Sequence, residues 1–482
     1  MNKKRTSWII LIFWIGTPQL WGQEIKNLPS AYKNLSATAL RGALRFERTC
    51  YDVKYYELSL KIDVKNKYIS GSNIIFFQAT DTTSLIQIDL DKRYTIDSIC
   101  FAKKQIPYFR RHNAIFTKFP SQLQRDSLYS VQVFYRGKGI NDFDRIYGSK
   151  GMMFKKDAQG RDWIGVSCEQ AGASLWFPNK DHLSDEPDSV RLHWIYPNHL
   201  KCISNGRLEA TKKDVIPNYD QSTWFVRNPI NNYNITFYLG NYLKIVIPYT
   251  SVNQQNYEIH CYFLDYDIDK AYNYYKHIPQ FLRFFEEKFG EYPYWSDKFA
   301  VVQSPYLGME HQGCLAIGEA LSGPKLFNHY YTLNAPYHST LIHEIAHEWW
   351  GNSVSASDMA HVWLHEGFAT YCEMLYIEKM FGRNKYLENI NFLRTYGNNN
   401  LPVLGRENIN ENMFENGNVY FKGACVIHDL REEINDDKIF FDILKTFQQR
   451  YKNKTVTTQH FVRLVNEKTN RNFTRFFEEK LK

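Results

Sequence analysis

The sequence contains no Cys-x-x-Cys pair, no internal repeat and no long run of lysine and arginine. The first absence excludes zinc ribbons and thioredoxin-type redox motifs, and the second excludes repeat solenoids. Nucleic-acid binding is not expected, because the net charge of +8 is spread along the chain and forms no clustered basic face. Beyond the N-terminus no stretch of about 18 apolar residues occurs, so no stable membrane span is expected.

Few prolines and many aromatic residues exclude further classes of protein. The 482 residues include only 16 prolines and are 16% aromatic, which excludes disordered and collagen-like chains. At roughly 150 residues per domain, this length corresponds to about two to four domains. The eight cysteines are widely spaced, and a chain of this size does not need disulfide bonds to fold. We therefore expect most of them to be buried as small apolar side chains.

The first 22 residues have the pattern of a secretory signal peptide. A basic segment at residues 3–5 precedes a short apolar run at residues 8–15, and the small residue Gly22 ends the segment. The apolar run is too short to cross a bilayer. We therefore expect export to a periplasmic or secreted location after cleavage near Gly22. An uncleaved anchor is the alternative, because Leu20 stands where a small residue is usual.

Hydrophobic periodicity divides the remaining chain into two domains of an α+β protein. Apolar and polar residues alternate at 56–64, 86–90 and 129–135, which predicts an antiparallel, sheet-rich domain over residues 23–249. Helical spacing then appears in several segments, which predicts a mainly helical domain over residues 250–482. These helical segments are 269–289, 336–351, 366–381, 419–434 and 458–468.

The segment His-Glu-Ile-Ala-His at residues 343–347 predicts a metal site. On a helix, His343 and His347 lie one turn apart on the same face, as two ligands of one zinc ion require. Glu344 is placed to take a proton from a metal-bound water. Glu366, separated from His347 by eighteen residues, supplies a third ligand, which leaves a fourth position for water. Two hydrogen-bonded core histidines without a metal are the alternative interpretation.

This pattern resembles the zinc-binding motif of the aminopeptidase N family of zinc metallopeptidases, a group of gluzincins that also includes leukotriene hydrolases. The resemblance covers nearly the whole chain after residue 22. Three further segments, in chain order, resemble motifs of the same family: Ser167-Cys168-Glu169, Gly308-Met309-Glu310 and Tyr420-Phe421-Lys422-Gly423. The resemblance implies a thermolysin-like catalytic domain behind a sheet-rich domain, with the active site between them.

The resemblance also implies the roles of individual residues. One Zn²⁺ per chain is expected on His343, His347 and Glu366, with Glu344 as the general base. Tyr420 is expected to donate its hydroxyl to the tetrahedral oxyanion.

The partners implied by the resemblance are peptides with a free N-terminus, cleaved at the first peptide bond. Glu310 and Glu169 are expected to bind the α-ammonium group of such a peptide. Gly308 and Met309 are expected to hold the substrate backbone.

Several positions depart from the family pattern. Leu307 and Gly308 replace the first two residues of the Gly-Ala-Met-Glu-Asn motif, and His311 replaces its asparagine. Ser167 stands where glutamine is usual, and His365 replaces a common asparagine. The sequence ends soon after the catalytic region, so the large C-terminal helical domain of longer members is expected to be absent. Two other functions stay open: epoxide hydrolysis on the same scaffold, and binding without catalysis.

Overall fold

A computed structural model of the chain describes residues 24–25, 29–144, 148–318, 339–398, 400–415 and 417–482. The segment predicted to be a signal peptide, residues 1–22, lies outside this part, as do the first residues of the helix predicted at 336–351. Within the described residues, no helix is both long and apolar enough to cross a bilayer. All eight cysteines are free, and all except Cys100 are buried, as expected for small apolar side chains.

An eight-stranded sheet forms the centre of the first domain. Its strands in spatial order are β14 (Arg207–Ile216), β15 (Tyr219–Val226), β12 (Ser189–Pro197), β1 (Tyr51–Asp63), β2 (Tyr68–Ala79), β8 (Leu128–Lys138), β4 (Thr95–Phe101) and β5 (Lys104–Gln105). In β1, Tyr56, Leu58, Leu60 and Ile62 are at most 1% exposed, whereas the residues between them are only partly covered. The pairing is antiparallel, as predicted, except between β1 and β12, which run parallel.

Two smaller sheets and three short helices complete this domain. One sheet contains β13 (Lys201–Ser204), β16 (Phe237–Gly240), β11 (Asp162–Ser167), β10 (Gly148–Lys156) and β9 (Asn141–Asp144), and the other contains β3 (Thr83–Asp89), β7 (Ala114–Leu123) and β6 (Tyr108–Arg111). The helices are α1 (Ser30–Lys33), α2 (Ala37–Gly42) and α3 (Phe46–Thr49). The three segments predicted from alternation correspond to β1, β3 and β8, and the sheet-rich prediction is confirmed.

The second domain begins with a sheet of its own, which the helical periodicity did not predict. Its strands are β17 (Tyr242–Thr250), β18 (Asn256–Leu264), β19 (Phe299–Gln303), β21 (Leu315–Ile317) and β20 (Gly308–Met309). The domain boundary predicted between residues 249 and 250 falls inside β17. Because β17 pairs with β18, the change of sheet occurs at Asn241, between β16 and β17.

Helices form most of the second domain, as predicted. They are α4 (Ile268–Tyr275), α5 (Ile278–Phe289), α6 (Ser339–His347), α7 (Trp363–Phe381), α8 (Arg383–Tyr396), α9 (Phe421–Ile434), α10 (Asp437–Tyr451), α11 (Thr458–Thr469) and α12 (Thr474–Lys480); β22 (Val354–Ala356) and β23 (Lys454–Val456) pair between them. The helix predicted at 269–289 is two helices, because Pro279 is tolerated only in the first turn of a helix, where α5 begins. The helices α8, α10 and α12 were not predicted.

The strands β19 and β21 of this sheet are covered on both faces, and the edge strand β20 beside β21 leads to the candidate site. Val301, Leu315 and Ile317 belong to the core shared with the helices, whereas Val302 and Ala316 belong to the core of the first domain. Strands buried on both faces read as continuous apolar runs, so alternation could not reveal them. The edge strand β20 ends directly before Glu310 and therefore delivers this residue to the junction of the two domains.

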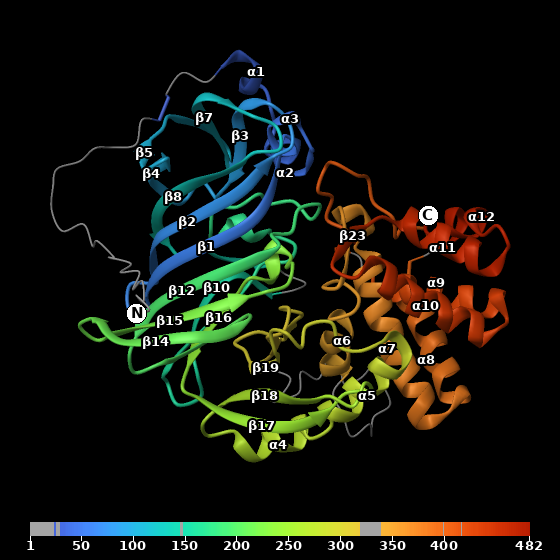
Figure 1. The fold of residues 1–482 in the computed structure, drawn as a ribbon. Coiled ribbons are helices and arrows are strands. Elements are labelled where there is room, and N and C mark those ends of the chain that lie inside the picture. Colours follow the sequence, from blue (N-terminus) through green and yellow to red (C-terminus); the bar gives the residue numbers. More distant parts are fainter. Residues whose placement is uncertain (1–23, 26–28, 145–147, 319–338, 399, 416) are drawn as a thin grey trace, which may run out of the picture.

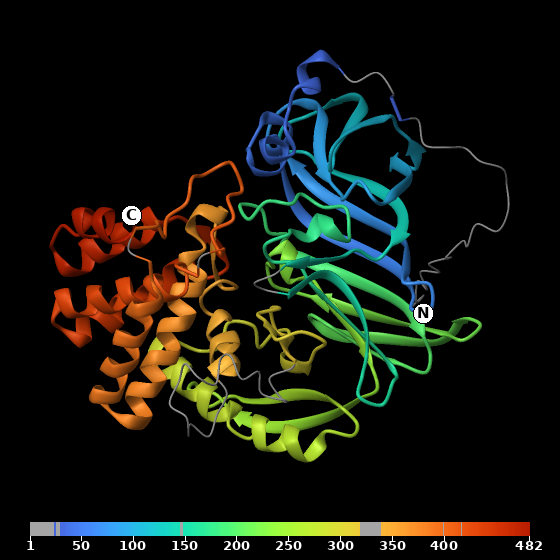
Figure 2. The same ribbon diagram turned by 180° about the vertical axis from the view of Figure 1, so that it is seen from behind.

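The helix α6 lies between the two halves of the molecule. Figures 1 and 2 show the sheets of the first domain on one side, the helices α8 to α12 on the other, and α6 in the middle. This helix contacts α5, α7, β20 and β21, all of which belong to the second domain. The segment 343–347 is thus packed within the helical domain and faces the sheet-rich domain.

A buried ion pair ties the N-terminal helices to the loop that follows Glu169. Arg48, in α3, donates from Nη2 to Asp89 Oδ2 at 2.6 Å, and both side chains are buried. Arg48 Nη1 also donates to the carbonyl oxygens of Arg41 and Asp181, at 2.8 and 3.4 Å. The main-chain N–H of Asp181 donates to the same Asp89 oxygen at 3.1 Å. Removing Arg48 would leave several buried acceptors unpaired.

We expect Arg48→Ala to lower the free energy of unfolding of the first domain by about 3–5 kcal/mol, because the buried carboxylate of Asp89 loses its cationic partner. Thermal unfolding, followed by circular dichroism, measures the effect. The matched control is Arg475→Ala, which removes an exposed pair with Glu479 and should leave the melting curve close to that of the wild type. Equal melting curves for the two variants would contradict the anchoring role of Arg48.

Candidate active site

Two imidazoles and one carboxylate converge between α6 and α7. His343 Nε2 lies 3.1 Å from Glu366 Oε2, and His347 Nε2 lies 3.3 Å from the same oxygen. The two histidines come from successive turns of α6, and Glu366 lies in the first turn of α7. The sequence prediction placed these three residues together, and the structure brings them together.

The opposite nitrogen of each imidazole has an acceptor of its own. His343 Nδ1 lies 2.8 Å from Glu373 Oε1, and His347 Nδ1 lies 2.9 Å from the carbonyl oxygen of Trp350. A carbonyl oxygen only accepts, so His347 Nδ1 carries a proton and its Nε2 presents a lone pair in the neutral ring. Such second partners fix the orientation of metal-binding histidines.

This donor set fits a zinc ion. Two imidazole lone pairs and a carboxylate oxygen facing one another repel unless a cation or extra protons lie among them. Ligand atoms about 2.0–2.1 Å from a tetrahedral zinc ion stand roughly 3.3 Å apart, which matches the separations of 3.1 and 3.3 Å. The residues that could hold the ion are therefore His343, His347 and Glu366.

The pKa values of His343 and Glu366 reflect the same close approach of imidazoles and carboxylates. Burial by itself would lower the pKa of His343, but the carboxylates of Glu366 and Glu373 raise it well above its usual value. Burial would raise the pKa of Glu366, but His347 and His343 lower it well below its usual value. The carboxylates thus favour positive charge at the imidazoles, which a bound cation would also supply.

Glu344 lies against the strand that carries the exopeptidase-like motif. A Cβ atom at position 308 would lie only 2.3 Å from Glu344 Oε1, so the glycine allows this carboxylate to approach the strand closely. Burial raises the pKa of Glu344 to about 8; His343 and His347 oppose this increase, whereas Glu310 adds to it. A buried carboxylate with such a pKa suits proton transfer near neutral pH.

Glu310 is fixed from both domains. Its carboxylate accepts a hydrogen bond of 3.0 Å from the hydroxyl of Tyr233, which lies in the 3₁₀-helix η2 (Asn232–Asn234) of the first domain. Its main-chain oxygen accepts from Asn352 Nδ2 at 2.7 Å, just beyond α6. Burial raises the pKa of Glu310, His347 lowers it and Glu366 raises it. Neighbouring Met309 has a buried side chain that contacts Ser167 Oγ at 3.7 Å.

Glu169 reaches the same site from the first domain. One carboxylate oxygen of each of Glu169, Glu310 and Glu366 lies within 4.8 Å of the others. Burial, together with the charges of Glu310, Glu366 and Glu344, raises the pKa of Glu169 well above its usual value. Three carboxylates this close cannot all be ionised unless a cation lies among them.

Tyr420 lies beside the first histidine. Its ring packs on His343 with centroids 6.0 Å apart and an interplanar angle of 29°. Lys422 points elsewhere: its Nζ donates to the main-chain oxygens of Leu401, at 3.0 Å, and Lys482. The lysine of this motif therefore has a structural role in holding the chain near α9.

Two of the histidines that depart from the family pattern are buried and neutral. His311 Nδ1 lies 2.6 Å from the Tyr238 hydroxyl, and His365 Nε2 accepts from the main-chain N–H of Ala356 at 2.6 Å. Burial lowers the pKa of each histidine to about 3. These bonds tie both imidazoles to groups other than the metal ligands, so both residues serve packing.

Sequence reasoning missed Tyr233, Glu373 and Asn352. Glu373 had a detectable signal, because it stands seven residues after Glu366 and so lies on the same face of a helix. Tyr233 and Asn352 had none, because their contacts with Glu310 span 77 and 42 residues of sequence.

The site lies at the junction of a sheet-rich and a helical domain. One helix carries two histidines and a glutamate, and the next helix carries the third candidate ligand. This arrangement is that of two-domain metallopeptidases. Comparisons with known families agree. Residues 52–233 match the peptidase M1 N-terminal domain, and residues 274–479 match the peptidase family M1 domain. The chain belongs to the peptidase M1 family.

Curated relatives include Aminopeptidase N of Lactobacillus helveticus, 21% identical over 443 residues, and Aminopeptidase 2 of Candida albicans, 23% identical over 343 residues. These alignments cover 83% and 67% of the chain but only 47% and 35% of the relatives. The chain thus spans less than half the length of these curated relatives.

Solved structures share the fold. An M1 zinc metallopeptidase from Deinococcus radiodurans superimposes with a TM-score of 0.72 at 20% identity, covering 89% of this chain and 93% of that one. The yeast LTA4 hydrolase superimposes with a TM-score of 0.69 at 16% identity, covering 90% of this chain and 66% of that one. At these identities the likeness concerns the fold.

Glu348, which follows the second histidine, provides a test of the electrostatics. Its Oε1 accepts from the main-chain N–H of Gly313 at 2.8 Å, and burial raises its pKa to about 8. The unfolded value is about 4.3, so the folded protein binds the proton more tightly. Its contribution to stability is therefore full at low pH and is lost as the pH rises through about 8.

We expect Glu348→Gln, which cannot titrate, to lose less stability than the wild type between pH 5 and pH 8.5. Thermal unfolding midpoints of the metal-free proteins measure this. The control is Glu388→Gln at an exposed position, which should follow the wild-type pH dependence. An unchanged pH dependence in Glu348→Gln would show that this carboxyl is already ionised in the folded protein.

Proposed function

We propose that the chain is a zinc aminopeptidase that removes the N-terminal residue from peptides. One observation carries this proposal: one carboxylate oxygen of each of Glu169 and Glu310 lies within 4.8 Å of the other and of a carboxylate oxygen of Glu366. An endopeptidase binds no free α-ammonium at that position and gains nothing from buried carboxylates there. An aminopeptidase needs such carboxylates to bind the α-ammonium by charge-assisted hydrogen bonds. The aminopeptidases among the relatives support the same activity.

Each step of peptide-bond hydrolysis is assigned to particular residues of the site. When bound, zinc supplies a Lewis acid that lowers the pKa of water and polarises the scissile carbonyl. Glu344 takes the proton of the attacking water and gives it to the leaving amine. Tyr420 donates its hydroxyl to the oxyanion of the tetrahedral intermediate. The main chain at Gly308, which approaches Glu344 closely, holds the substrate backbone.

Glu310 and Glu169 determine which bond is cleaved. The Tyr233 hydroxyl donates to one oxygen of Glu310 and leaves the other oxygen for the substrate. Burial and Glu310 raise the pKa of Tyr233 well above its usual value, so its hydroxyl stays protonated and remains a donor. A peptide whose terminus is held there presents its first carbonyl to the metal ligands. Measuring zinc content together with release of a chromogenic aminoacyl amide separates this function from epoxide hydrolysis and from binding without catalysis.

The roles of base and ligand are separable by substitution. Glu344→Gln should retain one zinc per chain and lose at least about 10²-fold in kcat, because it removes only the proton acceptor. Glu366→Ala, the matched variant, should lose both zinc and activity, because it removes a ligand. Metal analysis and turnover of an aminoacyl amide measure the two effects. Full zinc occupancy in Glu366→Ala would identify a different third ligand, and unchanged turnover in Glu344→Gln would exclude it as the base.

The free amine of the substrate provides a separate test. A hydrogen bond between Glu310 and the α-ammonium contributes about 1.5–3 kcal/mol, so Glu310→Ala should lower kcat/KM for free-amino peptides by at least about tenfold. The wild type should cleave N-acetylated versions of the same peptides far more slowly, because acetylation removes the charge and adds bulk. Glu169→Ala should act in the same direction. Equal cleavage of acetylated and free peptides would refute an aminopeptidase while leaving a zinc hydrolase.

A further inference from the structure

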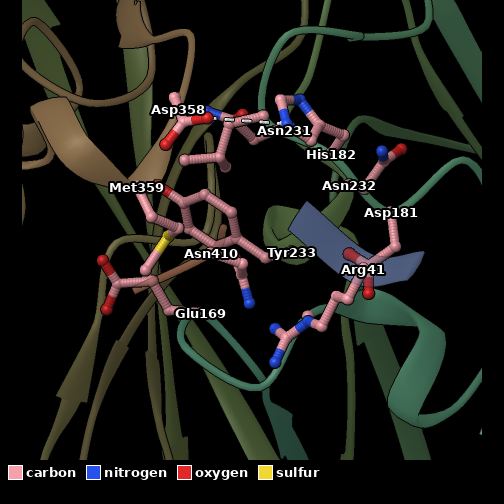
Figure 3. A pocket seen from close by; sticks show the side chains of 12 residues that line it. Arg41, Glu169, Asp181, His182, Asn231, Asn232, Tyr233, Asp358, Met359 and Asn410 are labelled. Carbon is pink, nitrogen blue, oxygen red and sulfur yellow. Dashed lines mark ion pairs between the residues drawn. The ribbon is translucent and has the colours of Figure 1, made fainter. Parts of the chain in front are cut away.

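Two pockets lie where the two domains meet, and they differ in size and in charge. The pocket beside Glu169, shown in Figure 3, has a volume of about 30 Å³. Asn231 and Asn232 line it, and their Nδ2 atoms donate to the carbonyl oxygens of Gly351 and Lys180, at 3.0 and 2.8 Å. Their Oδ1 atoms receive no hydrogen bond within the described residues. Water is the ligand that fits so small a polar space, and an organic ligand does not.

The larger pocket lies between two sheets. Its volume is about 490 Å³, which is within the range of sites for small organic ligands. Residues of β13, β14 and β15 line it from the first domain, and residues of β17 and β18 line it from the second. Figures 1 and 2 show β17 and β18 below β14 and β15, on the side away from the helices α8 to α12. Because β17 and β20 are the two edges of one sheet, this pocket is separate from the candidate metal site.

The lining of the larger pocket is positively charged. Among its described lining residues, five are lysine or arginine and none is aspartate or glutamate. The five are Lys201, Arg207, Lys213, Lys244 and Lys298. Only Lys213 has a carboxylate at ion-pair distance in the described part of the chain, that of Asp220 at 2.6 Å. Arg207 donates instead to the main-chain oxygens of Trp295 and Ser296, at 2.8 and 2.9 Å. Four positive charges therefore line one pocket without paired carboxylates.

Lys298 is a buried cation without a paired negative charge. The residue is only 4% exposed, and its Nζ donates to the carbonyl oxygens of Ser204, at 2.6 Å, and Gly206. An ammonium group has three donors, and these two neutral oxygens take two of them. Buried charges in proteins are normally paired, because an unpaired charge is costly to remove from water. An anion bound in the pocket would offset that cost.

The remaining walls are partly apolar and partly polar. Trp224 supplies apolar surface, and Thr211 and Tyr262 carry hydroxyl groups. Burial lowers the pKa of His260, so its ring adds no charge at neutral pH. Its partner Glu258, 3.1 Å from Nε2, has a side chain that is 65% exposed, so water screens this charge. These walls suit the hydroxylated body of an organic anion better than a bare inorganic ion.

We propose that this pocket binds a small, sugar-sized organic anion that carries two or more phosphate or sulfate ester groups. Ester oxygens of this kind accept hydrogen bonds, and lysine and arginine donate them without accepting. Two separated anionic groups match cations that come from both domains, Lys201 on β13 and Lys244 on β17. A neutral ligand would leave Lys298 unpaired, and a cation would be repelled. The pocket has no part in the proposed peptide hydrolysis, so this inference does not rest on that function.

Isothermal titration calorimetry of the zinc-loaded protein in about 0.15 M salt tests this inference, because that salt screens long-range attraction. The probes are fructose 1,6-bisphosphate, a disulfated disaccharide and neutral sucrose. At least one charged probe should bind at one site per chain, and sucrose should give no measurable heat. Binding of one charged probe alone identifies phosphate or sulfate esters as the ligand class, and binding of both identifies their shared chemistry. If neither charged probe binds, the inference is wrong.

Charge reversal at the pocket locates the bound probe. The double variant Lys201→Glu/Lys244→Glu should lower the association constant at least about tenfold, because it places like charges beside the ligand. The matched control Lys445→Glu/Lys452→Glu makes the same change of net charge at exposed positions in and just after α10, and it should stay within about twofold of the wild type. Equal losses in the two double variants would show that net charge alone attracts the probe, and would overturn the inference.

A third protein separates this pocket from the metal site. Glu366→Ala, which removes a candidate zinc ligand, should bind the charged probe as the wild type does, because none of the candidate ligands lines the pocket. Loss of binding in a folded Glu366→Ala protein would place the probe at the metal site and overturn the inference.

Discussion

Crowding of buried negative charge is the constraint on which this site depends. Four glutamates, Glu169, Glu310, Glu344 and Glu366, surround two imidazoles, and the charge of Glu366 contributes to raising the pKa of the other three beyond the effect of burial. Isolated buried carboxylates are costly, and fixed opposite charges offset that cost. The arrangement is therefore suited to two cations at once: a metal on the histidine side and a substrate amine on the side of Glu169.

The scaffold holds these groups in place from two domains. Glu169 and Tyr233 come from the first domain, whereas Glu310 and the metal ligands come from the second. The strands β19 and β21 are packed on both faces, so the edge strand β20, which pairs with β21, is held beside two cores. Fixing charged groups in this way before substrate arrives is how preorganised sites lower reaction barriers.

Local signals in the sequence suffice for the metal ligands and for much of the first domain. The spacing of His343 and His347 follows from helical geometry, and the strands β1 and β8 follow from alternation, because one face of each is more exposed. Local signals could not reveal β19 and β21, since burial on both faces removes their alternation. Only the tertiary structure brings Tyr233 to Glu310 and orients Asn231 and Asn232, because these contacts join segments that are distant in sequence. No periodicity in the sequence encodes which side-chain atom is left without a hydrogen-bond partner.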